Sequence, residues 1–309
     1  MRVFWDIIIR PFLQHMNARS VVEIGSEYGS NTQLLADFAR ETNSVIHTID
    51  PLPRFDTDAW QQKYNGALVC HTDASLNVLP NLGAFDAVLI DGDHNWYTVY
   101  HELDMIADHA AAHETSPIIF LHDLGWPYGR RDMYYDINRI PEEFRQPHAK
   151  NGISAKGDLS EDGYNAHLDH ALHEGGEKNG VATAVEDFLK ERPEWESRTI
   201  DAYHGLGILF PKSLLQTHPR LEEFLDQLTL SDVMKKLIGI MEKDRIAHTL
   251  ENFNEMISRE KTLRMLHQST IVQKEEIDLL KQRIGQIYGT ISWRITQPIR
   301  KIGEWMKRR

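Results

Sequence analysis

Acidic and imidazole side chains follow two neighbouring apolar runs of the chain, at the point where each run ends. They are Asp91, Asp93 and His94 after the first run, and His122 and Asp123 after the second. If the runs are parallel strands, these residues share the sheet edge where open α/β sheets bind ligands. Carboxylates can hold a hard divalent cation there, and an imidazole or carboxylate can deprotonate a hydroxyl nucleophile. The alternative is a structural network, in which His122 and Asp123 organise the loop and His94 supports another residue.

A tight turn near the start of the chain carries Gly25 and Gly29. Glycine lets a backbone turn sharply and approach a ligand closely. A dinucleotide-binding turn has a third glycine in the middle and points a helix N-terminus at pyrophosphate. Here Ser26, Glu27 and Tyr28 fill the turn. A carboxylate in this place repels pyrophosphate but tolerates the cationic S-adenosylmethionine. We therefore expect S-adenosylmethionine, with Ser26 among its contacts, and keep NAD as the alternative.

Two further acidic residues follow the next two predicted strands in order. Asp50 lies about twenty residues beyond the turn, where a carboxylate can accept hydrogen bonds from ribose hydroxyls. Asp73 follows the third strand and can address the adenine end of a nucleoside. The alternative is that each of them caps a helix.

Short β-branched runs alternate with amphipathic stretches, which is typical of a parallel sheet with crossover helices. The predicted strands are residues 20–24, 44–49, 68–71, 87–90, 117–121, 197–202 and 207–210, and helical periodicity covers 31–41 and 96–113. This pattern predicts an α/β fold, a doubly wound Rossmann-like and mostly parallel sheet, over residues 1–212.

The pattern dissolves between about residues 125 and 180 into Gly, Pro, Asn, His and Tyr. Long segments of this kind often form lids or binding loops, so we expect a lid insertion here. Arg130 and Arg131 can clamp a phosphate or carboxylate of an acceptor, and Trp126 can stack on a sugar ring. These three are the candidate substrate-binding residues.

The sequence resembles bacterial class I S-adenosylmethionine-dependent methyltransferases, in the branch that includes macrolide-sugar O-methyltransferases and cephalosporin-hydroxylase-like proteins. The residues that carry the resemblance are Glu23, Gly25 and Gly29 in the turn, Asp50, the run Phe85–His94, and Phe120–Asp123. It covers roughly residues 18–125 and the strands near 197–210. The resemblance implies that Glu23, Gly25, Asp50 and Asp73 contact S-adenosylmethionine. It also implies magnesium held by Asp91 and Asp123, with His122 beside them, and His94 as the base. His122 departs from the family pattern, because an acidic residue is common there in metal-binding relatives.

Residues 213–309 read almost entirely as helix. A heptad seam includes Leu266, Thr270, Gln273, Ile277, Leu280, Ile284, Ile287 and Ile291. Such a seam predicts either a homodimer through a coiled coil or an arm that packs on its own domain.

The last residues, from Ile291 on, hold six Lys or Arg against one Glu, with tryptophans and isoleucines between them. This composition suits an anionic membrane surface, and the alternative is docking on the acidic body of the same protein. The stretch Ser292–Arg300 also resembles the tails of bacterial glycosyltransferases that build surface polysaccharides.

A net charge of −12 argues against a partner made of nucleic acid, since phosphate binding needs a basic surface. The single cysteine, Cys70, fits a reducing compartment, and no apolar stretch approaches the roughly 18 residues of a membrane-spanning helix. We expect a cytoplasmic enzyme, peripheral at most on the inner face of the membrane, that methylates a hydroxyl of a sugar or lipid-linked glycan. The alternatives are an oxidoreductase, either cephalosporin-hydroxylase-like or NAD-binding, and a catalytically silent scaffold in a glycan assembly complex.

Overall fold

The structure is a computed structural model that describes residues 1–154, 157–161 and 163–308. Seven strands form one sheet in the order β11-β12-β5-β4-β1-β2-β3. They are β1 (Ser20–Ile24), β2 (Val45–Ile49), β3 (Leu68–His71), β4 (Ala87–Ile90), β5 (Ile118–His122), β11 (Trp195–Ile200) and β12 (Leu206–Pro211). Strands β1 to β5 pair in parallel, and β12 pairs antiparallel with both β5 and β11. The expected doubly wound, mostly parallel sheet is confirmed.

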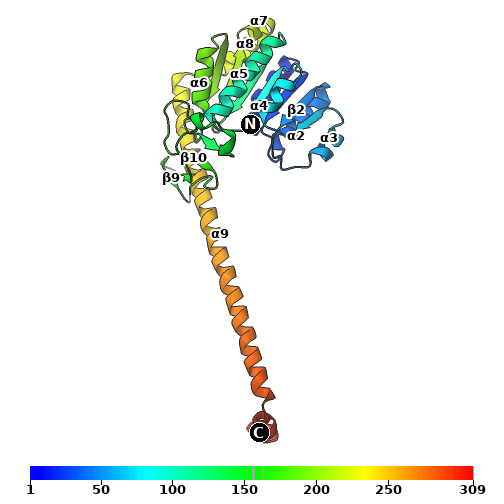
Figure 1. Ribbon diagram of the computed structural model, residues 1–309, viewed down its shortest axis with the longest axis vertical. Helices are drawn as coiled ribbons and strands as arrows, with labels where there is room; N and C mark the ends of the chain where they lie inside the picture. The colour runs from blue at the N-terminus through cyan, green and yellow to red at the C-terminus, as the bar shows by residue number, and fades with distance from the viewer. Residues whose placement is uncertain (155–156, 162, 309) are drawn as a thin grey trace. The chain divides into compact units, whose positions relative to one another are not determined.

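Helices cover both faces of this sheet (Figure 1). Neighbouring residues of a strand point to opposite sides of the sheet, so each face has its own apolar side chains to bury. Val21 lies in one apolar cluster with residues of the N-terminal helices and α2, and Val22 lies in another with residues of α5 and α6. The helical segments before β12 are η1 (Arg2–Phe4), η2 (Trp5–Ile9), α1 (Arg10–His15), α2 (Ser30–Thr42), α3 (Thr57–Tyr64), α4 (Ser75–Val78), η3 (Leu79–Asn81), α5 (Trp96–Ala112), η4 (Ile137–Arg139), η5 (Glu142–Phe144) and α6 (Val181–Glu191).

The insertion between β5 and α6 contains two small antiparallel sheets instead of a bare loop. They are β6 (Met133–Tyr134), β10 (Asp169–Ala171) and β7 (His148–Lys150) in one, and β8 (Gly152–Ile153) with β9 (Leu159–Ser160) in the other. The backbone amide of Met133 donates to the carbonyl of His94 at 3.0 Å. The insertion is therefore fastened to the chain directly after β4.

The chain divides into two compact units, Met1–Leu250 and Glu251–Arg309. The first includes α7 (Ser213–Thr217), α8 (Pro219–Gln227) and the start of α9 (Asp232–Gly289), and α10 (Ile291–Lys307) follows in the second. Leu214, Leu221 and Leu225 are buried in the core, which is why the first unit extends beyond the boundary expected at residue 212. Within the described residues, no helix has the length and apolar character needed to cross a bilayer.

Candidate active site

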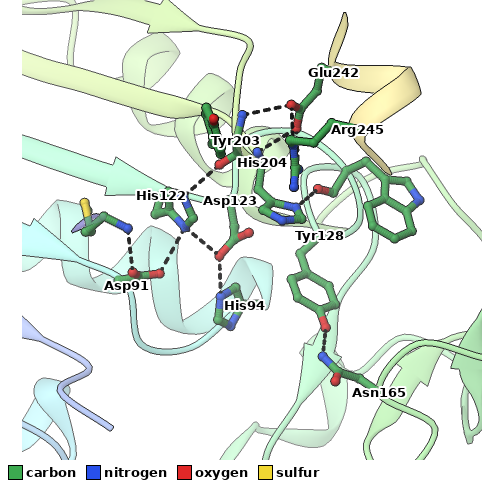
Figure 2. Close-up of polar contacts among 12 residues, drawn as sticks. Asp91, His94, His122, Asp123, Tyr128, Asn165, Tyr203, His204, Glu242 and Arg245 are labelled. Carbon is green, nitrogen blue, oxygen red and sulfur yellow. Dashed lines mark hydrogen bonds and ion pairs between the residues drawn. The ribbon is translucent and has the colours of Figure 1, made fainter. Parts of the chain in front are cut away.

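The side chains that follow β4 and β5 meet at the carboxyl edge of the sheet (Figure 2). His94 Nε2 lies 2.7 Å from Asp123 Oδ2, and His122 Nδ1 lies 3.1 Å from the same oxygen. His122 Nδ1 is also 3.2 Å from Asp91 Oδ1. Asp123 has a left-handed backbone (φ 63°), a conformation that aspartate tolerates better than most residues and that often marks functional sites. Two imidazoles and two carboxylates thus form one connected cluster.

Both ring nitrogens of His122 act as donors. Nδ1 faces the carboxylates of Asp91 and Asp123, and Nε2 lies 2.9 Å from the carbonyl oxygen of Tyr203, all of which only accept. Burial alone would lower the pKa of His122, but hydrogen bonds to Asp123 and Asp91 outweigh it and raise the pKa to about 10. His122 is therefore an imidazolium that bridges two carboxylates.

This bridge bears on the magnesium expected at Asp91, His122 and Asp123. Ligand atoms of the three residues do lie within 4.8 Å of one another. A histidine ligand needs a free lone pair, however, and His122 has none while both of its nitrogens donate. The imidazolium already supplies positive charge between the carboxylates, and the amino group of Met1 adds a second cation 3.2 Å from Asp91 Oδ2. The arrangement does not fit a magnesium site.

Asp91 is held by this ion network. Burial would raise its pKa, but the hydrogen bond and charge of His122, together with the Met1 amino group, outweigh burial and lower the pKa. Its side chain is 30% exposed and is the most accessible carboxylate of the cluster. Asp91 therefore stays ionised, and its structural role is to anchor His122.

His94 and Asp123 form a dyad that can act on a proton. Burial would raise the pKa of Asp123, but the charge of His94 and the hydrogen bonds of both imidazoles hold it well below its usual range. Burial would lower the pKa of His94, but the charge of Asp123 outweighs it and raises the pKa. With Nε2–H donating to Asp123, Nδ1 carries the lone pair of the neutral ring, and among the described residues this buried atom has no partner. It is the one nitrogen of the cluster able to accept a proton.

Asp93 does not join the cluster of His94, His122, Asp91 and Asp123, although the sequence made it a candidate catalytic carboxylate. Its Oδ1 accepts from the amide of His94 at 3.3 Å and its Oδ2 from the hydroxyl of Thr98 at 3.0 Å. Asn95 caps α5 directly after His94 by accepting from the Thr98 amide at 2.9 Å. Burial raises the pKa of Asp93. These contacts fix the backbone around His94, so Asp93 is a positioning residue.

The glycine turn after β1 is built by close backbone packing. Gly25 has φ 88°, and a Cβ there would lie 2.3 Å from the carbonyl oxygen of Asp91. Gly29 has φ 77° and begins α2 against the ring of Trp60. Asp50 Oδ2 accepts from the amides of Ser26 and Glu27, at 2.9 and 2.8 Å, and its Oδ1 accepts from the amide of Leu52. Asp50 thus holds the turn, and Oδ1 keeps one lone pair for a ribose hydroxyl.

Glu23 does not lie where a cofactor can touch it. It is 1% exposed, and it accepts from Asn31 Nδ2 at 2.9 Å, Thr32 Oγ1 at 2.6 Å and Thr48 Oγ1 at 2.8 Å. Burial raises its pKa to about 7, although the hydrogen bonds act against this. The direct contact that the resemblance implies is therefore corrected: Glu23 ties β1 to the start of α2 and supports the turn from behind.

A hollow lies beside the turn at the ends of β2 and β3. Ser26, Asp50, Cys70 and His71 are among its lining residues, and they come from three successive strand ends. Asp73, just beyond it, is exposed and accepts from the Ala74 amide at 2.7 Å and from Asn77 Nδ2 at 3.0 Å. These bonds lower the pKa of Asp73. Neither of them caps a helix, because the N-cap residue of α4 is Ala74 and has no side-chain cap, so the adenine contact of Asp73 stays a prediction.

The two lid arginines are committed to the protein itself. Arg131 is 4% exposed and donates to the carbonyl oxygens of Ala171 and Gly157, and Arg130 forms a two-pronged pair with Glu186 on α6. The buried Arg131 does not fit the expected clamp, whereas the Arg130–Glu186 pair lies at the surface, so Arg130 stays a candidate substrate-binding residue. Trp126 stays a candidate substrate-binding residue. Its ring centre lies 5.9 Å from that of Tyr164, so two aromatic rings of the lid lie together.

Several residues of the site carry no pattern in the sequence. Tyr128 from the lid packs against His94 with the rings tilted by 55° and 4.8 Å between their centres, and Asn165 donates to the Tyr128 hydroxyl. The loop that holds His122 through the Tyr203 carbonyl is itself held by Glu242 of α9, which accepts from the amides of Tyr203 and His204 (Figure 2). Only the fold brings these distant segments together.

Part of the chain is similar to known methyltransferases. Residues 22–124 match a protein family described as a methyltransferase domain. Among solved structures, the chain is similar to the methyltransferase PaMTH1 from Podospora anserina, bound to S-adenosylhomocysteine, with 15% identity, 64% of this chain and 74% of that chain covered, and a TM-score of 0.39. It is also similar to the O-methyltransferase TomG from Streptomyces achromogenes, which is involved in tomaymycin synthesis and was solved in complex with S-adenosylmethionine, with 13% identity, 65% and 76% coverage, and a TM-score of 0.38. A search of curated proteins found no match.

The sheet order, the glycine turn and the family match define a Rossmann-like methyltransferase fold with a long C-terminal helix. Within this fold, residues 22–124 are the part of the chain that matches a methyltransferase domain.

Proposed function

We propose that the enzyme transfers a methyl group to a hydroxyl oxygen of a sugar or of a surface-glycan intermediate. The observation that carries the proposal is the His94–Asp123 dyad with its unpartnered Nδ1. A neutral alcohol is a poor nucleophile, and a positioned base that removes its proton in the transition state typically contributes 10²–10⁴-fold to the rate. A dyad of this kind is what methyl transfer to oxygen needs.

The roles of the protein's own groups follow from their contacts. Asp123 keeps the Nε2–H of His94 in place, so that Nδ1 receives the acceptor proton as the oxygen attacks. Asp91 and the His122 imidazolium fix Asp123 and balance its charge. When bound, S-adenosylmethionine supplies an electrophilic methyl group. Ser26 and Asp50, which lie beside the hollow at the ends of β2 and β3, are proposed to bind it.

The surroundings of His94 support a neutral, carbohydrate acceptor. The rings of Tyr128 and Tyr135 lie 4.8 and 6.0 Å from the His94 ring between centres, and the Tyr135 side chain is exposed. Aromatic faces bind the apolar faces of sugar rings. Arg130 and Arg131 already have partners within the protein, which argues against an acceptor recognised through phosphate or carboxylate.

The proposal is tested in two steps. Calorimetry should detect S-adenosylmethionine binding, and labelled S-adenosylmethionine should transfer methyl groups to members of a panel of methyl glycosides and nucleotide sugars. His94→Gln should lower the transfer rate at least about 100-fold while leaving the cofactor affinity within about twofold. His148→Gln, at an exposed lid position, is the matched control.

Two results would contradict the proposal. Binding of NADH without S-adenosylmethionine would overturn the cofactor. Transfer to amine acceptors but to no hydroxyl in the panel would overturn oxygen as the acceptor atom.

A further inference from the structure

Helix α10 carries an apolar stripe along one side. Ile291, Ile295, Ile299, Ile302 and Met306 recur at intervals of three and four residues and are 57–76% exposed. This spacing aligns them on one helix face. An exposed stripe of five large apolar side chains is costly in water and indicates a surface that another phase or molecule covers.

Cations line one edge of this stripe. Arg294, Lys301 and Arg308 follow one another at intervals of seven residues, which is close to two helical turns, so they form a single row. Arg300 lies over the Trp293 ring, with its guanidinium carbon 3.4 Å from the ring centre, on the side away from the stripe. From Ile291 on, six Lys or Arg stand against one Glu, whereas the first 290 residues hold 28 Lys or Arg against 45 Asp or Glu. Positive charge is therefore concentrated on this helix.

We infer that α10 binds along an anionic lipid surface, with the isoleucine stripe in the interface and the row of cations at the phosphate headgroups. The combination of features selects this occupant. A second copy of α10 could cover the stripe, but it would bring two strongly cationic helices together. An acidic protein surface would attract the cations but would leave the stripe in water. An anionic leaflet satisfies both, and α10 is too polar to cross it.

The test uses the full-length protein, sedimented with vesicles of phosphatidylcholine alone and with vesicles of phosphatidylcholine mixed with phosphatidylglycerol. We expect binding to the anionic vesicles only, and release in high salt because exposed charges are screened. Lys301→Gln should weaken binding about fivefold, since each cation near an anionic leaflet contributes about 1 kcal/mol.

A matched pair of variants separates insertion from charge alone. Ile299→Glu and Gln297→Glu add the same negative charge two residues apart, but only Ile299 belongs to the stripe. Ile299→Glu should weaken vesicle binding at least about tenfold more than Gln297→Glu, because it also removes an apolar side chain that would enter the lipid interface. Calorimetry with S-adenosylmethionine checks that both variants stay folded. The sedimentation assay needs no methyl acceptor, so its outcome is independent of the proposed activity.

Three outcomes would overturn the inference. The first is equal binding to neutral and anionic vesicles, and the second is equal binding of the two variants. The third is no binding to either vesicle, which would favour docking on a protein surface.

Discussion

His122 carries a positive charge in a place where the sequence suggests a metal ligand. Its folded pKa of about 10 lies above the value of 6.5 for a free histidine. A raised folded pKa contributes stability that is complete below pH 6.5 and is lost as the pH rises through 10. Asp91 and Asp123 have lowered pKa values, so their contribution is lost toward acid instead. The cluster should therefore be most stable in mildly acidic solution, above the ordinary aspartate pKa of 3.8 and below the ordinary histidine pKa of 6.5.

Because His122 loses its proton more readily in the unfolded chain, we expect the free energy of unfolding to fall by up to about 1.4 kcal/mol per pH unit between pH 7 and 9 through His122 alone. His122→Gln, which cannot carry the charge, should lose much of that slope. Urea denaturation at the two pH values measures it, with His148→Gln as the control. An unchanged slope in His122→Gln would show that the imidazolium does not form.

Removal of metal ions tests the assignment of His122 through the rate of methyl transfer. Because both nitrogens of His122 donate protons, we expect chelation by EDTA to leave methyl transfer unchanged within about twofold. Transfer that stops on chelation and returns with magnesium would mean that His122 loses its proton and that Asp91 and Asp123 hold the ion. The measurement is the transfer rate before and after dialysis against the chelator.

The sequence could locate these residues but not their protonation. Placement after two apolar runs was enough to predict that Asp91, His94, His122 and Asp123 meet at one edge. Which nitrogen donates, however, depends on the Tyr203 carbonyl, which lies far along the chain. Arg131 makes a related point, because the carbonyl oxygens that hold its guanidinium come from distant segments and cannot be read from the sequence.

At the scale of elements, the glycine turn leaves no room for a larger residue. A Cβ at Gly25 would lie 2.3 Å from the Asp91 carbonyl oxygen and 2.5 Å from Gly92 Cα, so the turn and the loop after β4 pack backbone to backbone. One substitution here disturbs both the cofactor side and the catalytic side of the edge.

Gly25→Ala should therefore lower the free energy of unfolding by more than about 2 kcal/mol and abolish S-adenosylmethionine binding. Gly66→Ala is a matched control, since Gly66 also has a left-handed backbone (φ 86°) but nothing within 4 Å of its Cβ position. Backbone strain alone should cost Gly66→Ala about 1–2 kcal/mol, with binding retained. Equal losses in the two variants would show that strain, and not the contact with Asp91, sets the requirement. Denaturation and calorimetry decide it.

The elements themselves were predictable where periodicity is strong. Strands β1, β3 and β4 begin and end at the expected residues, because short β-branched runs between polar turns are unambiguous. The N-terminal helical segments have a weaker signal: the run from Phe4 to Ile9 is short, although Phe4, Ile8 and Phe12 lie four residues apart and are all buried. The lid strands have two or three residues each, too few to show alternation.

At the scale of the whole molecule, α9 presents an exposed heptad seam. Leu266, Ile277, Leu280, Ile284 and Ile287 are 48–59% exposed. The pair Ile277 and Leu280 has the arrangement that favours a parallel coiled coil of two helices, and in that register Glu276 of one helix faces Lys281 of its partner. We propose that this seam pairs two copies of the chain.

Sedimentation equilibrium should then give a dimer for the full-length protein. Ile284→Glu, in the seam, should produce monomers, whereas Gln282→Glu, outside it, should leave the dimer intact. Both variants add one negative charge, so a common loss of dimer would assign association to general electrostatics.

The start of α9 is connected to the candidate active site by hydrogen bonds. Glu242 grips the amides of Tyr203 and His204, and the carbonyl of Tyr203 receives the Nε2–H of His122. Two hydrogen bonds thus connect α9 to the loop at Tyr203 and His204, and a third connects this loop to the His122 imidazolium. His122 in turn contacts Asp123. The start of the C-terminal helix and the imidazolium of the candidate site therefore share one loop, so a change at Glu242 should be felt at His122.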